Sequence, residues 1–170
     1  MKIVTLWISA FVYLNLTNGS FSQSAIEHHV WQDHRKFEAF SRTAVAITGS
    51  INLSGNSFFA KPGSTMKMTF ANGKSVKLTQ VLAAWRHWGD IDDRKVTAEV
   101  FRLDSDPGKL LNGNTLCGSV EKINHIYAVF YDDTLLGTEP LLELAIFRSQ
   151  NPPFDKNSQG LCGTFNFYVR

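Results

Sequence analysis

Two tryptophans and three charged or ionisable side chains stand together in the segment 85–90, WRHWGD. Indole rings provide flat apolar platforms for a sugar or a protein partner, and the arginine and aspartate add polar contacts. The predicted binding residues are Trp85, Arg86, Trp88 and Asp90. The structural alternative is a short helix that ends at Gly89, since Val81, Leu82 and the two tryptophans also follow a helical spacing and would be buried together.

Catalytic signatures are missing from the chain. It has no Gly-x-Ser-x-Gly elbow, no His-Glu-x-x-His motif and no glycine-rich phosphate loop. His125 lies in an otherwise apolar segment, near Tyr127 in the alternation, and a hydrogen-bonded core histidine is its structural interpretation. A small hydrolase that uses His125 or His87 is therefore an alternative function. We assign no catalytic residue.

Three histidines near the N-terminus, His28, His29 and His34, have side chains that suit zinc or copper. Metal handling by this segment is a second alternative, although neighbouring histidines on a helix point in different directions. The aspartates of segment 90–93 lack the pattern of a calcium loop, and segment 104–108 has the chemistry of a tight turn. We predict no metal site and no cofactor.

The two cysteines, Cys117 and Cys162, predict a disulfide. An even pair in an exported chain is typical of a structural bridge, and two residues this far apart form neither a redox motif nor a complete zinc site. Each cysteine stands in a Leu-Cys-Gly context, at Leu116 and Leu161 respectively. A glycine after each cysteine permits a close approach of the two backbones.

These paired motifs, within the blocks 111–118 (LNGNTLCG) and 160–165 (GLCGTF), resemble a group of uncharacterised exported bacterial proteins. The resemblance covers the stretch from Ser41 to Arg170. It implies a periplasmic or secreted setting, and it implies no activity.

Residues 1–22 have the features of a signal peptide. Lys2 precedes an apolar stretch, Ile3 to Leu16, and small residues at Ser20 and Ser22 match a cleavage site. The stretch is shorter than the roughly 20 residues of a membrane span. We expect a periplasmic or secreted protein without stable membrane insertion after cleavage. The remaining chain has a net charge of +1, which argues against a nucleic-acid partner.

The remaining chain reads as one domain, with an N-terminal amphipathic helix in residues 23–42 and a β-rich part in residues 43–170. Ser24 and Glu27 match a capping box for that helix, which we place over residues 24–41. Runs of β-branched and aromatic residues between turn formers predict seven strands. They cover residues 44–53, 65–70, 75–81, 95–103, 123–131, 141–148 and 164–169. Seven strands predict a single antiparallel sandwich or barrel.

One hairpin permits a prediction of register. A three-residue loop, Ala71 to Gly73, pairs Met68 with Val76 and also sets Lys67 opposite Lys77. The segments 123–131 and 141–147 carry apolar residues in both alternating positions, which is typical of strands covered on both faces.

Three long loops are able to carry a function: 54–64, 104–116 and 150–160. With the absence of catalytic motifs and the balanced charge, they favour an exported noncatalytic binding module. Its expected partner is a protein or a cell-envelope component, and its oligomeric state stays open.

Overall fold

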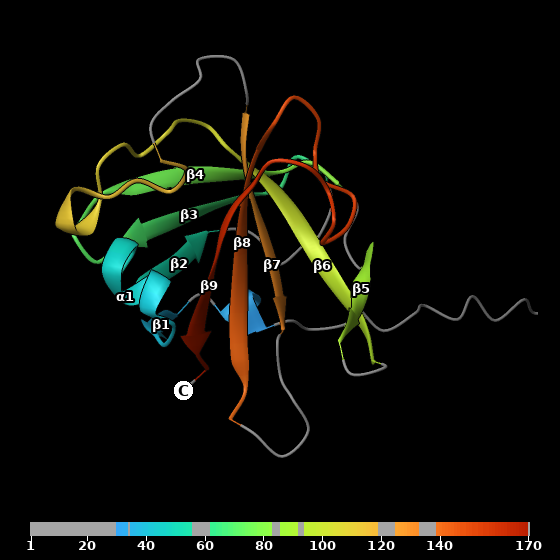
Figure 1. Cartoon of the computed structure of the whole chain (residues 1–170), viewed down its shortest axis with the longest axis horizontal. Helices are drawn as coiled ribbons and strands as arrows, with labels where there is room; N and C mark the ends of the chain where they lie inside the picture. Colours follow the sequence, from blue (N-terminus) through green and yellow to red (C-terminus); the bar gives the residue numbers. More distant parts are fainter. Residues whose placement is uncertain are drawn as a thin grey trace, which may run out of the picture.

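The computed structural model describes residues 30–33, 35–55, 62–82, 86–91, 94–118, 125–132 and 139–169. Most of these residues form antiparallel strands (Figure 1). The strands are β1 (Lys36–Ala39), β2 (Ile51–Gly55), β3 (Thr65–Phe70), β4 (Ser75–Gln80), β5 (Arg86–Ile91), β6 (Arg94–Leu103), β7 (His125–Asp132), β8 (Leu141–Ser149) and β9 (Leu161–Tyr168). The helical elements are the 3-10 turns η1 (Val30–Asp33) and η2 (Leu111–Gly113) and the short helix α1 (Arg42–Ile47).

Eight of the strands close into a barrel. Their order is β4-β3-β2-β1-β9-β8-β7-β6, every pairing is antiparallel, and a further pairing of β4 with β6 completes the circle. β5 stands apart from this circle and pairs with β6 as the other arm of a hairpin. The fold is therefore a closed barrel, which decides between the sandwich and the barrel predicted from the sequence.

The hairpin of β3 and β4 has the predicted register. Met68 lies opposite Val76, and Lys67 lies opposite Lys77. Gly73 has a φ of 84°, and the Phe70 N–H donates to the Lys74 carbonyl at 2.8 Å. The three-residue loop is confirmed because its left-handed glycine allows the register that buries the apolar side chains of both strands.

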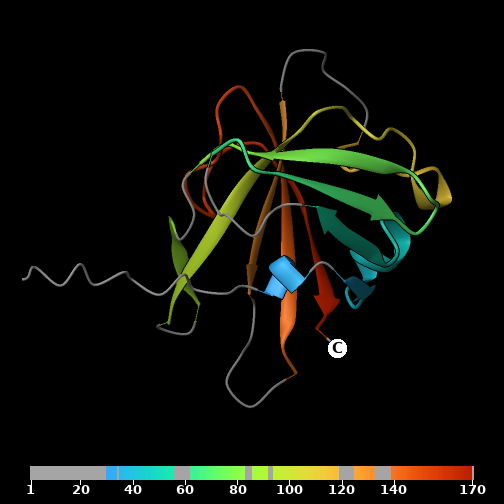
Figure 2. The ribbon, with the colours of Figure 1, turned by 180° about the vertical axis from the view of Figure 1, so that it is seen from behind.

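Aromatic and aliphatic side chains fill the barrel, as expected for an eight-stranded barrel of this size. Fully buried examples include Phe37, Phe101, Phe130, Phe165 and Phe167. The turn η1 contacts β2 and β7. In Figure 2, which shows the molecule from behind, this turn is the blue element in front of the barrel. There the Trp31 Nε1 donates to Glu99 Oε2 at 3.1 Å, and the Gln32 side chain donates to Glu99 Oε1 at 3.4 Å. These two bonds help to compensate the burial of the Glu99 carboxyl.

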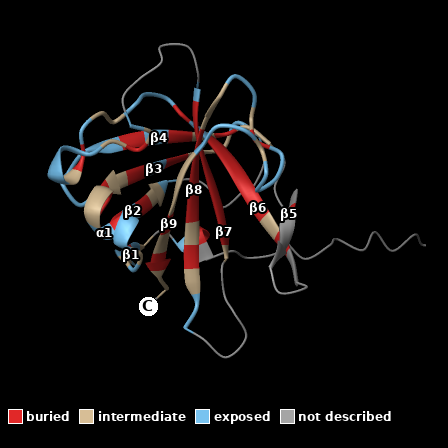
Figure 3. Cartoon of the chain, in the orientation of Figure 1, coloured by how far each residue is buried: buried red, intermediate tan, exposed pale blue. Residues whose placement is uncertain are grey.

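The central strands β7 and β8 are covered on both faces, as predicted (Figure 3). The side chains of Ala128 and Phe130 belong to the barrel interior, whereas Tyr127 and Val129 belong to a second apolar cluster outside it. Trp88 of β5 covers that second cluster. The continuous apolar pattern of these strands therefore reflects two separate cores.

The predicted N-terminal helix is not present in the described part of its range. Val30–Asp33 is a 3-10 turn, and Lys36–Ala39 is a strand between β2 and β9. Phe37 is buried while Lys36 and Glu38 are exposed, which is the alternation of a half-buried strand. The barrel needs this strand for closure, and its hydrogen bonds outweigh the helical spacing of the apolar residues. Residues 24–29 lie outside the described residues.

The strand predicted over residues 44–53 is wrong in its first half. α1 begins after Ser41, whose Oγ accepts the Ala44 N–H at 3.2 Å, as an N-cap does. It ends before Gly49, which has a φ of 58° and whose backbone lies close to Ala71. A capping serine and a left-handed glycine eight residues apart favour one short helix over a strand. Only the second half of the range forms β2.

The predicted signal peptide, residues 1–22, lies outside the described residues. Among the residues that the structure describes, no helix is long and apolar enough to cross a membrane.

Candidate functional site: the β8–β9 loop on strand β5

The segment predicted to bind a partner forms β5. Arg86 and Asp90 are placed by their backbone only, and Trp85 lies outside the described residues. Trp88 is 2% exposed, and its ring centroid lies 5.8 Å from that of Phe147 and 6.1 Å from that of Tyr131. The alternative of a short helix is wrong, since β5 is a strand with a register shift between His87 and Gly89. Trp88 is a packing residue beneath the surface.

Trp88 has a further property that the sequence does not reveal. Its indole Nε1 is buried and has no hydrogen-bond partner among the residues that the structure describes. A buried donor without an acceptor costs about 1–3 kcal/mol. The aromatic contacts of the ring therefore stabilise β5 despite the cost of burying the indole N–H.

The loop between β8 and β9, Gln150 to Gly160, lies against β5 and β7. The Lys156 N–H donates to the Trp88 carbonyl at 3.2 Å, and the Tyr127 hydroxyl lies 3.4 Å from the Gln150 carbonyl. At its far end the Arg148 N–H donates to the Gly160 carbonyl at 2.7 Å. We call residues 150–160 the loop surface. It is held at its start, middle and end, and its contact with Trp88 joins it to the segment 85–90.

Side chains within the loop surface fix its conformation. Ser158 Oγ accepts the N–H groups of Phe154 at 2.9 Å and Asp155 at 3.2 Å, and Asp155 Oδ1 accepts the Asn157 N–H at 2.9 Å. Pro152 and Pro153 restrict the preceding backbone, and Pro153 is buried. These contacts leave the Phe154 side chain 54% exposed beside a depression of about 300 Å³ that the loop itself lines.

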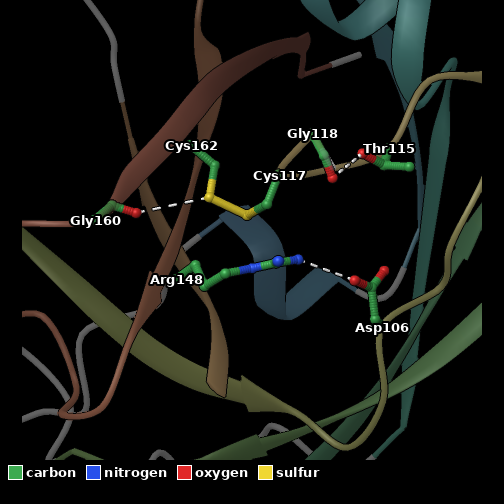
Figure 4. Close-up of a disulfide and its surroundings, with 7 residues drawn as sticks. All are labelled: Asp106, Thr115, Cys117, Gly118, Arg148, Gly160 and Cys162. Atoms are coloured by element: carbon green, nitrogen blue, oxygen red, sulfur yellow. Dashed lines mark hydrogen bonds and ion pairs between the residues drawn. A yellow bond between two sulfur atoms is a disulfide. The ribbon is translucent and has the colours of Figure 1, made fainter. Parts of the chain in front are cut away.

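The disulfide Cys117–Cys162 is confirmed, with the two Cα atoms 4.8 Å apart. It joins the loop before β7 to the beginning of strand β9, next to the end of the loop surface (Figure 4). The Arg148 guanidinium makes a parallel connection to Asp106 at 3.0 Å. A Cβ atom at Gly160 would lie 2.2 Å from the Arg148 carbonyl oxygen, so this position requires glycine.

His125 lies at the exposed start of β7 and is not the core histidine that the sequence analysis considered. Its ring stands edge-on to Tyr127, with the centroids 6.2 Å apart. Burial raises the pKa of Tyr127, and the nearby charge of Arg102 acts in the opposite direction. The side chain of His87 is not described, so a catalytic role of either histidine stays a prediction.

The aspartates of segment 104–108 have structural partners. Asp104 lies 3.6 Å from the Lys77 ammonium, and Asp106 Oδ1 accepts the Gly108 N–H at 2.8 Å. Among the described residues, no group of three or more metal-ligating side chains comes together. His28, His29 and His34 lie outside those residues.

Glu143, the one acidic residue in the apolar pattern of β8, is also satisfied. The Tyr131 hydroxyl donates to one of its oxygens, and Asn166 Nδ2 donates to the other at 3.0 Å. The three residues lie in one row across β7, β8 and β9 on the outside of the barrel. They connect neighbouring strands beside the Trp88 cluster.

Comparison of the chain with protein-family models, with curated proteins and with solved structures finds no match.

Sequence reasoning missed Phe154 as an exposed residue of the loop surface and Tyr127 as one of its anchors. The loop itself was recognisable from its prolines and its position before Cys162. The exposure of Phe154 was not, because it depends on the hydrogen bonds of Ser158 and on the packing of the loop against β5.

Proposed function

We propose that the chain is an exported, noncatalytic binding module that captures a protein or a cell-envelope component through the loop surface, residues 150–160. The observation that carries this proposal is the exposed Phe154 on a loop that is anchored to β5, β7 and β8. Aromatic side chains, including phenylalanine, are enriched in protein–protein interfaces relative to the rest of the surface.

The anchoring supports recognition because it lowers the entropy lost on binding. A loop that is already held by its own hydrogen bonds and by a neighbouring disulfide has little conformational freedom left to lose. The depression beside Phe154 offers backbone and hydroxyl groups next to the aromatic ring, which is the usual mixture of apolar and polar groups in a binding site.

The proposed compartment is the periplasm or the exterior of the cell. A disulfide within a β-barrel fits an oxidising compartment. The signal-like features of residues 1–22 and the resemblance to exported bacterial proteins are consistent with this setting.

A photo-crosslinking experiment tests the proposal. A benzophenone amino acid replaces Phe154 in one variant and Val45 of α1 in another, because Val45 is similarly exposed at 56% and lies on a different part of the surface. After irradiation in a cell-envelope extract, we expect a discrete crosslinked product from position 154 that is missing from position 45. Competition with unlabelled protein should remove the product, whereas an unlabelled Phe154→Ala variant should compete poorly.

Equal crosslinking from both positions would contradict a specific surface. Undiminished competition by Phe154→Ala would contradict the role of the aromatic side chain, provided that Val45→Ala competes like the unmodified protein.

A further inference from the structure

The strands β2, β3 and β4 lie side by side in Figure 1, and their outer face has a composition unlike that of the other described outer strands. Every second residue points away from the barrel interior, and all of these are amides, hydroxyls or lysines. They are Asn52, Ser54, Thr65, Lys67, Thr69, Ser75, Lys77 and Thr79. This lysine-hydroxyl face, as we call these eight residues, contains no acidic, aliphatic or aromatic side chain.

Two of its lysines stand directly opposite one another. Lys67 of β3 pairs with Lys77 of β4, and Lys77 in turn lies 3.6 Å from Asp104 at the border of the face. Side chains in this relation have Cβ atoms about 4.5–5.5 Å apart, and like charges so placed repel each other. Lys67 has no ion pair in the part of the chain that the structure describes. An anion bound between the two ammonium groups would replace this repulsion with attraction.

A depression of about 400 Å³ lies at this pair. Its polar lining consists of Ser54, Thr65, Lys67, Ser75 and Lys77. A second depression of about 240 Å³ adjoins it around Asn52 and Thr69 and is lined in addition by Lys36, which stands opposite Asn52 on β1. The face therefore offers two neighbouring hollows, each with a cation and with hydroxyl or amide groups.

We propose that the lysine-hydroxyl face binds an acidic polysaccharide. The lysines match sulfate, phosphate or carboxylate groups, and the serine, threonine and asparagine side chains both donate to and accept from sugar hydroxyls. The face has no aromatic or arginine side chain on which nucleobases stack, which disfavours single-stranded nucleic acid.

The attraction is local rather than a property of the whole molecule, since the net charge of the chain is only +2. Glu38 on β1 and Asp104 beside β4 are acidic residues at the borders of the face, and Arg102 of β6 lies opposite Thr79 at its β4 edge. This surface is distinct from residues 150–160, so the inference does not depend on the function proposed for that loop.

The test uses the oxidised full-length protein and immobilised dextran sulfate, with neutral dextran as the uncharged control. We expect binding to dextran sulfate that weakens as salt rises from about 50 mM to about 200 mM, and no binding to neutral dextran. The double variant Lys67→Gln/Lys77→Gln should bind about tenfold more weakly. The matched control, Arg42→Gln/Lys109→Gln, removes two exposed charges from outside the face and should bind like the unmodified protein.

Several results would overturn the inference. They are an absence of binding to dextran sulfate, equal weakening in both double variants, and equally tight lysine-dependent binding of a DNA duplex. Circular dichroism and thermal melting of each variant show whether it is folded, and loss of binding in a folded Lys67→Gln/Lys77→Gln chain is the supporting result.

Discussion

The barrel has two outer faces that differ in almost every property. On one side, the outer residues of β6, β7 and β8 are mostly apolar and pack with Trp88, and Arg102 and Glu143 are charged exceptions. On the other side, the outer residues of β2, β3 and β4 are lysines, hydroxyls and an amide, open to solvent or half-buried. Both faces enclose the same apolar interior. The difference shows that the interior determines the fold, while the exterior of each set of strands is available for a separate purpose.

The covered face contains a second cluster of buried apolar side chains, which stabilises the fold and supports an anchored loop. The open face contains no such cluster among the described residues and presents lysine side chains to solvent. A substitution in the covered face should therefore change the free energy of unfolding, whereas a substitution in the open face should change mainly the interactions with other molecules. Four expected outcomes test this contrast.

The largest effect is expected from the disulfide, whose cysteines pack against the barrel interior. Cys117→Ser/Cys162→Ser should lower the free energy of unfolding by about 4 kcal/mol, because the unfolded chain loses the constraint of a long closed loop. Urea denaturation measures the change. Asp106→Asn is the control, since it weakens only the parallel ion pair with Arg148 and should cost about 1 kcal/mol or less. Similar losses in the two variants would contradict a dominant role of the disulfide.

Trp88 provides the next test. Trp88→Ala should destabilise the chain by about 3 kcal/mol, because it opens a cavity between β5 and the barrel. Trp88→Phe keeps an aromatic ring against Phe147 and removes the unpartnered indole donor, so it should cost about 1 kcal/mol or less. A large loss with both substitutions, measured by urea denaturation, would show that the indole makes a contribution beyond packing.

Tyr127 gives the covered face a pH dependence. Burial raises its pKa, so the folded chain keeps the phenol proton to a higher pH than the unfolded chain does. The corresponding stability is complete below the unfolded pKa of about 10 and is lost as the pH rises through the folded pKa. The unmodified protein should therefore lose stability above about pH 10 relative to Tyr127→Phe. Parallel denaturation curves of the two proteins across the alkaline range would contradict this.

The smallest effect belongs to the open face. Lys67→Gln should raise the free energy of unfolding by about 0.2–0.5 kcal/mol, because it removes a like charge opposite Lys77. The gain should shrink in high salt, which screens exposed charges. A loss of stability in thermal melts of Lys67→Gln would mean that Lys67 has a structural role in the sheet.

The elements that the sequence predicted correctly are those with local and unambiguous signals. Gly73 and the alternation around Met68 and Val76 specify one hairpin register, and the doubly apolar pattern of β7 identifies a strand with two buried faces. In contrast, the strand Lys36–Ala39 depends on partners far along the chain, at Ile51 and Phe167. A helical spacing of apolar residues cannot reveal such nonlocal pairing.

The candidate site was predictable only in part. The cysteine pair and the loop 150–160 follow from residue types and spacing, whereas the contact between Lys156 and Trp88 joins two segments that are distant in the sequence. The pattern of residues 85–90 identified Trp88 as a candidate binding residue but did not show that its side chain is buried against the barrel. Exposure of Phe154 emerges only when the loop is folded onto the barrel.

The most direct test of the account is chemical-shift mapping of the labelled, oxidised chain with the component captured through position 154. We expect amide shifts in residues 150–160 and in β5, with α1 and the lysine-hydroxyl face unchanged. The same map recorded with dextran sulfate should show the reverse, with shifts on β3 and β4. Shifts confined to α1, or an identical pattern with both ligands, would contradict two separate binding faces on one barrel.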